Sequence, residues 1–319
     1  MVRQLKIAVV GGSGFIGSAA VRRLRELGCA VAAFHRGDGA DIRGDRRDLP
    51  AHREAFGRFA PEVVLDTIAF TERDASDLVA TFRGLARRLV VLSSQDVYAA
   101  YGRLLRLEEG APDQTPARED APVRRSRFPY RAAARGREDM AFEYEKVLVE
   151  QAASADAGLP ATILRLPCTY GPGDLHHRVG QVLARMHPGE PLSLDRAKAA
   201  WRWTRGYVEN VADAIALAAT DERAMGRTYN VGEERALTES EWAREIGRAA
   251  GWEGEVREVA RGELAPGIAE PYDFAHDLVV DTERIRGQLG YRERVGRGVA
   301  VEAAVAWERA YPIENNVVE

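Results

Sequence analysis

The sequence predicts an α/β fold, in which a doubly wound parallel sheet is interleaved with a smaller C-terminal domain. Short apolar stretches alternate with amphipathic helical stretches through the first 166 residues, at the spacing of a parallel sheet. A glycine-rich turn joins the first apolar stretch to the first helix. The alternation is lost at residues 167–174, which are rich in Pro and Gly. A chain of 319 residues is long enough for about two such domains.

The first strand and the first helix are joined by a turn with glycines at three-residue spacing. An apolar strand over Leu5–Val10 leads to Gly11, Gly14 and Gly17, and a helix over Ala19–Leu27 follows. We expect Gly11 to form the turn, Gly14 to let a pyrophosphate approach the backbone, and Gly17 to let the helix pack on the strand. Because the N–H groups at a helix start attract anions, this order predicts a Rossmann dinucleotide-binding domain.

The second and third strands place polar residues where the adenosine end of a dinucleotide is bound. The second strand is expected over Cys29–Phe34, and Arg36 follows it. An arginine suits a 2′-phosphate, whereas an acidic residue would bind a 2′-hydroxyl, so NADP is favoured over NAD. A surface arginine after a strand is the alternative. Asp45 and Arg46 follow a short third strand and are expected either to contact the adenine or to lie in a solvated turn.

The fourth strand is expected over Glu62–Asp66, and the residues after it lie at the carboxyl edge of the sheet, where a cofactor binds. Further residues expected along the cofactor are Phe15, Ile16, Thr67, Ile68 and Pro167. The later elements expected are helices over Asp74–Leu85, Glu138–Ser154 and Glu239–Ala250, strands over Arg88–Ser93, Ala161–Leu166 and Thr228–Val231, a long loop over Arg103–Arg127, and a turn or short strand leading into a helix over Val208–Ala219.

These elements suggest how the chain is divided into domains. Residues 1–166 are expected to form the dinucleotide-binding domain, and residues 206–231 to return to it. Residues 167–319 are expected to form mainly a substrate domain.

Composition excludes several classes of protein. The net charge of −4 provides no global field for nucleic acid or an anionic membrane, so neither is an expected partner. No apolar run is long enough to span a bilayer. The two cysteines, Cys29 and Cys168, and the absence of a secretory leader predict a cytoplasmic protein with reduced thiols.

Nearly the whole chain resembles the extended short-chain dehydrogenase/reductase superfamily, and within it the NAD-dependent epimerase/dehydratase family. The resemblance rests on Gly-Gly-Ser-Gly-Phe-Ile-Gly at 11–17, Ser-Ser-Gln-Asp-Val-Tyr at 93–98, Lys146 with Glu150, Arg165 with Tyr-Gly-Pro at 170–172, the stretch 207–214, and Tyr-Asn-Val-Gly at 229–232. These motifs are modest individually and specific in this order and spacing.

The resemblance implies a Ser/Thr, a Tyr and a Lys beside the nicotinamide. Ser94, four residues before Tyr98 as in the family, would hold the substrate oxygen, and Lys146 would bind the nicotinamide ribose and lower the pKa of a catalytic tyrosine. The resemblance also implies a homodimer joined by the helices at Asp74–Leu85 and Glu138–Ser154.

The sequence departs from the family pattern at the tyrosine. The family places this residue four positions before the lysine, where this chain has Phe142, which cannot carry a proton. The nearest tyrosine is Tyr144, two positions before Lys146. Residues two apart on a helix lie about 200° apart, so Tyr144 is expected to act only if the helix is locally distorted; otherwise it packs elsewhere.

Two further phenol and carboxyl groups are candidates for acid–base work. The family's dehydratases have two acidic residues directly after the Ser/Thr, and this chain has Gln95 and Asp96 there. Asp96 is expected either to act as a base or to bond the backbone at the strand end. Tyr98 is the other phenol expected within reach of a substrate.

The substrate side offers two more candidates. His176, next to His177 after a Gly-Pro-Gly-Asp turn, is expected to contact substrate or to lie on the loop surface. No metal site is expected, because adjacent histidines without Cys or carboxylate partners do not form a coordination shell. Arg205 follows two tryptophans and is a candidate for a substrate anion, with burial among those tryptophans as the alternative.

The sequence therefore predicts an NAD(P)-dependent oxidoreductase, epimerase or dehydratase that acts on a hydroxyl or carbonyl group of a sugar-like or other polar small molecule. Two other classes remain open at this point. The chain would be a dinucleotide-binding sensor or scaffold if Phe142 marks the loss of redox chemistry. It would bind RNA if it resembles instead the branch of the superfamily that includes plastid RNA-binding members, although its negative charge argues against this.

Overall fold

A seven-stranded parallel sheet forms the centre of the molecule in a computed structural model that describes residues 4–265 and 267–313. Its strand order is β11-β6-β5-β4-β1-β2-β3. The strands are β1 (Lys6–Val10), β2 (Ala30–His35), β3 (Ile42–Arg43), β4 (Val63–Asp66), β5 (Arg88–Ser94), β6 (Ala161–Leu166) and β11 (Thr228–Asn230). The chain winds outward from β1 to β3 and then crosses over to β4, so the strand order reverses between β1 and β4. This reversal is the topological switch point of a Rossmann-type sheet, and the predicted fold class is confirmed.

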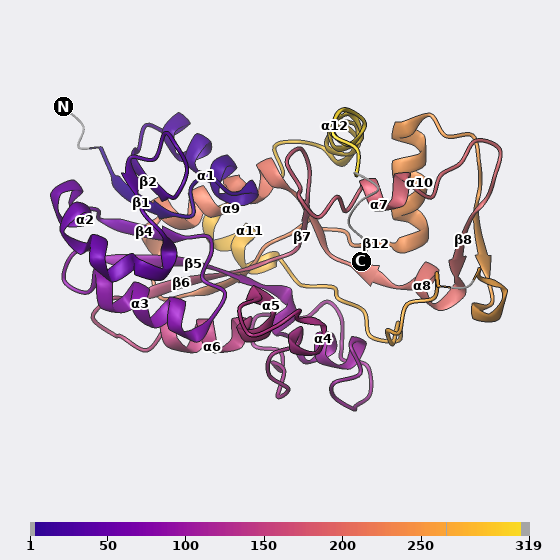
Figure 1. Cartoon of the computed structure of the whole chain (residues 1–319), viewed down its shortest axis with the longest axis horizontal. Coiled ribbons are helices and arrows are strands. Elements are labelled where there is room, and N and C mark those ends of the chain that lie inside the picture. Colours follow the sequence, from indigo (N-terminus) through magenta and orange to yellow (C-terminus); the bar gives the residue numbers. More distant parts are fainter. Residues whose placement is uncertain (1–3, 266, 314–319) are drawn as a thin grey trace.

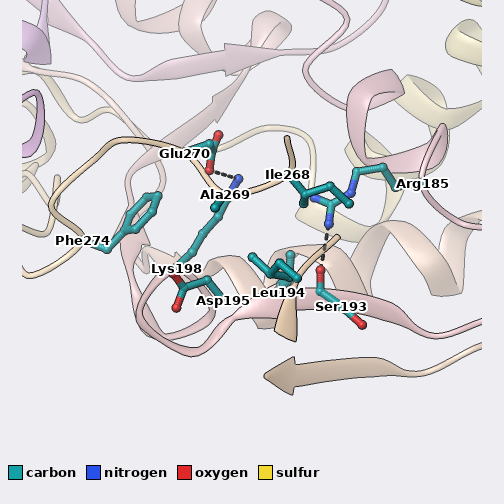
Figure 2. Close-up of a pocket in the computed structure, with 10 residues that line it drawn as sticks. Arg185, Ser193, Leu194, Asp195, Lys198, Ile268, Ala269, Glu270 and Phe274 are labelled. Atoms are coloured by element: carbon teal, nitrogen blue, oxygen red, sulfur yellow. Dashed lines mark hydrogen bonds and ion pairs between the residues drawn. The ribbon is translucent and has the colours of Figure 1, made fainter. Parts of the chain in front are cut away.

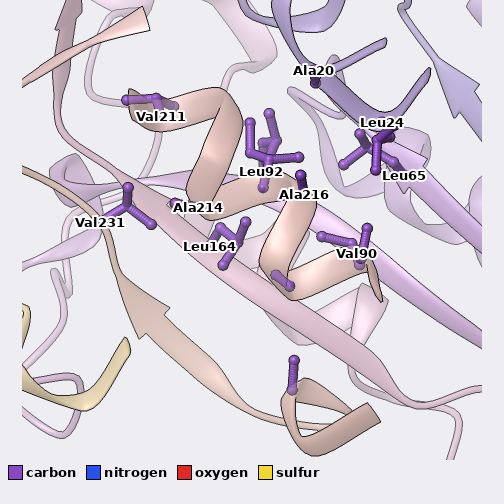
Figure 3. Packing of buried hydrophobic residues seen from close by; sticks show 14 of the residues in the cluster. Ala20, Leu24, Leu65, Val90, Leu92, Leu164, Val211, Ala214, Ala216 and Val231 are labelled. Atoms are coloured by element: carbon purple, nitrogen blue, oxygen red, sulfur yellow. The ribbon is translucent and has the colours of Figure 1, made fainter. Parts of the chain in front are cut away.

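Helices cover both faces of the sheet because the apolar side chains of each strand alternate between two cores. In β1, Ile7 and Val9 face one core, and Ala8 and Val10 face the other. The first core packs α1 (Phe15–Glu26), α9 (Val208–Thr220) and α11 (Glu283–Leu289) against the sheet (Figure 1), and Figure 3 shows side chains that α1, α9 and the strands contribute to it. The second core packs α2 (Arg53–Phe59), α3 (Glu72–Phe82) and α6 (Lys146–Ala153) against the opposite face.

Two elements from the second half of the chain return to the sheet. The helix α9 packs beside α1, and β11 pairs with β6. The guanidinium group of Arg88, at the start of β5, donates hydrogen bonds to the carbonyl oxygens of Ala218 (2.7 Å) and Ala219 (2.6 Å). These bonds satisfy carbonyls that the C-terminus of α9 leaves without helical partners. Segments far apart in sequence thus share one core.

The remaining elements form a smaller lobe, at the orange and yellow end of Figure 1. Its strands are β7 (Cys168–Tyr170), β8 (Leu192–Asp195), β9 (Arg202–Trp203), β10 (Arg205–Tyr207), β12 (Leu237–Thr238) and β13 (Val256–Val259). Its helices are α7 (Gly180–Leu183), α8 (Arg196–Ala200), α10 (Glu239–Ala250) and α12 (Arg297–Ala310). A separate apolar cluster, which includes Trp242, Ile246 and Val301, holds α10 against α12.

The helix expected over Glu138–Ser154 is wrong in one respect, because the structure divides it. A short helix α5 (Met140–Glu143) is separated from α6 by Tyr144 and Glu145, whose backbones are extended. The loop expected over Arg103–Arg127 begins slightly later than predicted, because α4 (Ala99–Leu104) extends into its first residues. In the described residues no helix is both long enough and apolar enough to cross a membrane.

Candidate active site

The glycine turn has the geometry that its three glycines predict. Gly11 has a positive φ of 87°, and a Cβ there would lie 2.4 Å from Thr67 Oγ1. A Cβ on Gly17 would lie 2.1 Å from the carbonyl oxygen of Gly11, so only glycine allows α1 to pack this closely on the turn. The Thr67 hydroxyl donates to the carbonyl oxygens of Val10 (3.0 Å) and Gly11 (3.1 Å) and fixes the turn to the end of β4.

Gly14 differs from the other two glycines because the protein itself does not fill the space beside it. A Cβ built there meets no atom of the described residues closer than 3.7 Å, and the backbone has an ordinary φ of −71°. Gly14 precedes α1, whose first turn carries no acidic residue and no side-chain cap. A helix start with free N–H groups and an open approach fits a pyrophosphate. The residues present therefore suit the dinucleotide that the sequence predicts.

Other predicted cofactor residues surround this turn. The side chain of Ile68 lies against Gly11, because a Cβ added to Gly11 would lie 2.8 Å from Ile68 Cγ2. Phe15 lies beside Gly173 in the loop after β7, whereas Ile16 packs against the first core. Pro167 is buried at the carboxyl end of β6, next to Gly206. The structure therefore brings residues from β1, α1, β4 and β6 to one edge of the sheet.

The adenosine end of the site departs from the prediction at Arg46. This side chain does not project over an adenine position; it is buried, and its Nη2 lies 2.8 Å from Asp66 Oδ2 and 2.5 Å from the carbonyl oxygen of Asp74. Asp66 is fully buried at the end of β4, and a buried carboxylate needs a cationic partner. The side chain of Arg46 is therefore structural.

Asp45 and Arg36 lie at the surface beside this pair. The Asp45 carboxylate caps the 3₁₀ helix η1 (Arg46–His52) and accepts two hydrogen bonds from the Arg47 guanidinium, which holds the pKa of Asp45 well below its usual range. Arg36 follows β2, its side chain is 78% exposed, and its Nη1 lies 3.8 Å from Asp45 Oδ2. The exposed guanidinium of Arg36 is accessible to a ligand at the end of β2.

Lys146 is buried at the start of α6 and points to the carboxyl edge of the sheet. Its ammonium group donates to the carbonyl oxygens of Ala69 (2.7 Å) and Leu92 (2.8 Å). An ammonium has three N–H donors, so one donor remains beyond these two carbonyls. Burial lowers the pKa of Lys146 to about 8, against the opposing effect of Asp96 and Asp66.

Tyr144 is the phenol that the structure brings to Lys146. The break in the helix turns its ring onto Phe70, at a centroid distance of 5.9 Å, and the Lys146 ammonium lies 5.8 Å from the centre of the Tyr144 ring. The Tyr144 hydroxyl donates a hydrogen bond to Asp96 Oδ2 (2.8 Å). Phe142, four positions before Lys146, instead packs against the Arg131 guanidinium at 4.7 Å.

Asp96 lies in the 3₁₀ helix η2 (Gln95–Val97), directly after β5, and is 4% exposed. The Tyr130 hydroxyl also donates to Asp96 Oδ2 (3.3 Å), and the backbone N–H of Asp96 donates to Ser94 Oγ (3.2 Å). Its second oxygen, Oδ1, is buried and accepts no hydrogen bond from any residue that the structure describes. Burial raises the pKa of Asp96, although the Arg124 charge and the Tyr144 hydrogen bond oppose this.

The acid–base character of this cluster follows from its burial. Desolvation and the adjacent Asp96 carboxylate raise the pKa of Tyr144 well above its ordinary value, whereas a hydrogen bond with Ser94 lowers it. The proton between Tyr144 and Asp96 therefore resides on the phenol at rest. Ser94, Asp96, Tyr144 and Lys146 all meet at the carboxyl ends of β4 and β5.

A buried ion pair explains why the helix breaks before Lys146. Arg124 and Glu145 are both fully buried, and the guanidinium Nη2 lies 3.0 Å from Glu145 Oε1. Glu145 also accepts hydrogen bonds from the backbone N–H groups of Phe128 (2.7 Å) and Val147 (3.0 Å) and so caps α6. A continuous helix could not place the Glu145 carboxylate at both partners. The break shifts Tyr144 into the site that Phe142 would otherwise approach.

Three predicted substrate contacts do not meet this cluster. The Tyr98 hydroxyl donates to Asn230 Oδ1 (2.6 Å) and accepts from Arg165 (3.0 Å), so it belongs to a buried network. Arg205 is 5% exposed and pairs with Glu239, in keeping with burial among its tryptophans. His176 lies on the exposed loop before α7. Tyr98 thus has partners in the large sheet, Arg205 has a partner in the smaller lobe, and His176 faces solvent.

Sequence reasoning missed Arg124, Tyr130 and Glu145. They lie in or beside a stretch without periodicity, and only their spatial position gives them a role. A buried charge in a loop has no sequence signal of its own, and Glu145 lay in the middle of the predicted helix over Glu138–Ser154, so nothing in the sequence marked it as a cap.

Two further features of the described residues concern metal binding and a cavity in the smaller lobe. Within residues 4–265 and 267–313, no cluster of three or more His, Cys, Asp or Glu side chains could hold a metal. A cavity of about 10 Å³ lies beside β8 and α8, where Lys198 pairs with Glu270 and Arg185 donates to the carbonyl oxygen of Ser193 (2.7 Å), as Figure 2 shows. It is large enough for one water molecule at most.

Comparison with known proteins agrees with this geometry. The family model described as the NAD dependent epimerase/dehydratase family matches residues 7–232. A dTDP-glucose 4,6-dehydratase of Streptomyces niveus is 26% identical over 346 aligned residues, which cover 96% of this chain and 93% of that protein.

Solved structures share the fold. UDP-glucose 4-epimerase of Stenotrophomonas maltophila, with bound NAD and formylated UDP-arabinopyranose, superposes with a TM-score of 0.71 at 19% identity, covering 97% of this chain and 99% of that one. UDP-glucose 4-epimerase of Thermus thermophilus, in complex with NAD, has a TM-score of 0.65 at 24% identity, with 96% and 99% covered.

Proposed function

The chain belongs to the NAD dependent epimerase/dehydratase family and is an NAD-dependent enzyme, and from this premise we propose that it acts on a hydroxyl or carbonyl carbon of a sugar nucleotide. The observation that carries the proposal is the 2.8 Å hydrogen bond between the Tyr144 hydroxyl and Asp96, beside the buried ammonium of Lys146. Tyr144 and Asp96 together can accept a proton, whereas the side chain of Phe142 cannot. The sensor or scaffold hypothesis is therefore disfavoured.

The mechanism assigns a separate task to each side chain. Gly14 and the N–H groups that start α1 would hold the pyrophosphate, and the third donor of Lys146 would hold the nicotinamide ribose. When bound, the dinucleotide supplies the hydride acceptor for the carbon that carries the hydroxyl. Ser94 orients the substrate oxygen beside Tyr144.

Proton transfer runs through two groups of this chain. The Tyr144 oxygen takes the proton of the substrate hydroxyl while its own proton moves to Asp96 Oδ2 along the existing hydrogen bond. After the transfer Asp96 is a neutral carboxylic acid. Tyr144 gains one proton as it loses another, so no isolated phenolate forms. Burial, which raises the pKa of Asp96, makes that carboxylate a stronger base than an exposed aspartate.

The cofactor preference, compartment and assembly are part of the same proposal. The exposed Arg36 at the end of β2 supports NADP as the preferred dinucleotide, although Asp45 lies close enough to offset part of its charge. The buried, unpaired Cys29 and Cys168 support a cytoplasmic location. The helices α3 and α6 pack side by side and would join two copies of the chain, which light scattering in solution tests.

The test of function uses purified protein with NAD or NADP and a panel of UDP-glucose, UDP-glucuronic acid and dTDP-glucose. We expect binding of a dinucleotide and either reduced nicotinamide or an epimerised or dehydrated sugar, detected by absorbance and NMR. Failure to bind either dinucleotide would refute the proposal. Binding without chemistry on any sugar nucleotide would revive the sensor hypothesis.

A further inference from the structure

Three phenols and one carboxylate form a continuous chain of hydrogen bonds at the site. The Tyr144 hydroxyl bonds Asp96 Oδ2 at 2.8 Å, the Tyr130 hydroxyl bonds the same oxygen at 3.3 Å, and the hydroxyls of Tyr130 and Tyr101 lie 2.7 Å apart. The four side chains come from η2, α4, the loop before α5 and the break before α6. The function proposed above uses only the first of these bonds.

Ring packing keeps this chain in order. The Tyr130 ring packs edge to face on Tyr144, with centroids 5.0 Å apart, and on Tyr101, with centroids 6.2 Å apart. Each ring is therefore held by a neighbouring aromatic ring as well as by its hydrogen bond. Asp96 is almost completely buried, whereas all three tyrosines are partly exposed, and a substrate at the site would cover Tyr144 but not Tyr101. The series thus runs from a buried carboxylate toward the surface.

We propose that Tyr130 and Tyr101 form a proton path that connects Asp96 to solvent and resets the Tyr144–Asp96 pair while a substrate covers Tyr144. This inference rests on the proposed function. After a substrate oxidation, Asp96 carries the proton that Tyr144 has passed to it. The Tyr130 hydroxyl then turns its proton from Asp96 to Tyr101, and the Asp96 O–H bond breaks as its proton moves to the Tyr130 oxygen. The Tyr130 proton moves to the Tyr101 oxygen, and the Tyr101 proton moves to water.

These steps balance without any further reactant. Each phenol gains one proton and loses one, so both remain neutral, and Asp96 returns to its carboxylate form. The proton released to water comes from Tyr101, and the net change equals the loss of one proton from the substrate hydroxyl. The groups that face Asp96 and set its affinity for a proton are Arg124, Glu145 and Lys146, together with the three phenols.

A first experiment measures the path without turnover. In protein labelled at tyrosine, NMR saturation transfer gives the rate at which the Tyr144 hydroxyl proton exchanges with water while NADH and UDP-glucose, which cannot react with each other, are present. We expect Tyr130→Phe to slow this exchange about tenfold, because the ring packing is kept and only the hydroxyl is lost. Tyr101→Phe should slow it by a similar factor.

The matched control is Tyr311→Phe, which removes a phenol that stacks on Trp307 in the C-terminal helix region. Exchange in this variant should equal that of the wild type. If Tyr130→Phe also leaves the exchange rate unchanged, the proton reaches water by another route and the path is refuted. Equal melting temperatures of the variants show whether a slower rate reflects a changed fold.

A second experiment separates the path from the proposed function. We expect Tyr130→Phe to lower kcat about tenfold with KM unchanged, less than the ~10²-fold or greater loss expected when the acid–base phenol itself is removed. The acid limb of its pH profile should also shift, because Tyr130 no longer donates to Asp96. If turnover is lost in a Tyr144 variant but unchanged in Tyr130→Phe, the proton path is refuted and the proposed function is not. Absence of turnover in every variant would contradict the function, and the exchange measurement would still decide on the path.

Discussion

At the scale of single residues, the activity that we propose depends on which aromatic side chain lies beside the lysine ammonium. The structure places Tyr144 at Lys146 and directs Phe142 toward Arg131. The phenol beside the lysine is therefore the one two positions before it, and the residue four positions before it points elsewhere. Which of the two side chains lies beside Lys146 is decided by the break between α5 and α6 and not by the residue types alone.

Tyr144→Phe is expected to reduce turnover at least about 10²-fold, since it removes the group that we propose as the acceptor of the substrate proton. Dinucleotide affinity should change little, because the pyrophosphate cradle lies at Gly14. Steady-state kinetics and calorimetric titration with NAD measure the two effects separately.

The matched control restores a phenol at the position that the family uses. In the double variant Phe142→Tyr, Tyr144→Phe, the new hydroxyl is on the Arg131 side of α5 and should leave activity as low as in the single variant. Recovery of turnover would mean that the helix is continuous in the working enzyme, contrary to our account.

The pH dependence of stability reports on Lys146. Its pKa falls from 10.5 in the unfolded chain to about 8 in the folded protein because the ammonium is buried. Between these pH values the unfolded state binds more protons, so the contribution of Lys146 makes the folded state more stable as pH rises. Below about pH 8 both states are protonated, and this contribution no longer changes.

Lys146→Met should abolish this contribution. The difference in free energy of unfolding between wild type and variant is expected to change by on the order of 3 kcal/mol between pH 8 and 10.5, in favour of the wild type at the higher pH. Urea denaturation across this range measures the difference, in which the titration of distant groups cancels. A difference independent of pH would show that the ammonium is not desolvated.

At the scale of elements, the Arg124–Glu145 ion pair sets the break between α5 and α6. Glu145→Ala leaves the fully buried Arg124 charge without its carboxylate and removes the cap of α6. We expect a loss of about 3–5 kcal/mol in the free energy of unfolding, as is typical when one partner of a buried pair is removed. Chemical denaturation measures this loss.

The double variant Arg124→Leu, Glu145→Leu tests what the pair does beyond stability. Without a buried charge it should regain most of the lost free energy of unfolding, but the helix can then run through residue 145 and turn Tyr144 away from Asp96. A stable protein with low turnover is expected. Full activity in this variant would show that the ion pair does not determine the position of Tyr144.

Gly14 and Gly17 give a second contrast at this scale, within one turn. Gly14→Ala should weaken dinucleotide binding with little effect on stability, because its Cβ enters space that the protein leaves open. Gly17→Ala should destabilise the protein itself by about 1–3 kcal/mol, since its Cβ would lie 2.1 Å from the Gly11 carbonyl oxygen. Thermal unfolding and NAD titration of both variants check this pair. Equal effects on binding and stability would contradict it.

The sequence predicted the elements whose patterns are local. The strands of the sheet and the helix over Glu239–Ala250 follow from apolar periodicity, and the glycine turn follows from its spacing. The helix break was not predictable, because its cause is the distant Arg124, more than one element away in the chain. The prediction that Arg46 contacts the adenine was wrong for the same reason, because its buried partner Asp66 lies at the end of β4, 20 residues further along the chain.

At the scale of the whole molecule, the two lobes are interleaved in sequence and pack on each other, because the apolar cluster that holds α10 against α12 also includes Ala19 of α1 and Ala212 of α9. The helix α9 and strand β11 lie in the larger lobe although they follow β7 in sequence, and Asp213 of α9 pairs with both Arg23 and Arg294. This interleaving supports treating residues 206–231 as part of the dinucleotide-binding domain. Unfolding one lobe then removes packing from the other, so the chain should unfold cooperatively.

Ligand-induced stabilisation measures this coupling. All five tryptophans lie after residue 200, in the smaller lobe or the C-terminal helix, whereas the glycine turn lies at residues 11–17. NAD at about a hundredfold excess over its dissociation constant should raise the free energy of unfolding by about 2.7 kcal/mol. The transition seen by tryptophan fluorescence should shift with the one seen by circular dichroism. If the unfolding transition followed by tryptophan fluorescence does not shift when NAD is added, the lobes unfold independently.

The most direct measurement is a crystal structure of the protein with NAD and a sugar nucleotide bound. Our account predicts the pyrophosphate at Gly14, the nicotinamide on the Lys146 side of the sheet, and the reacting sugar oxygen within hydrogen-bond distance of the Tyr144 hydroxyl. A sugar oxygen that contacts neither Tyr144 nor Asp96, with a continuous helix through residue 145, would contradict it.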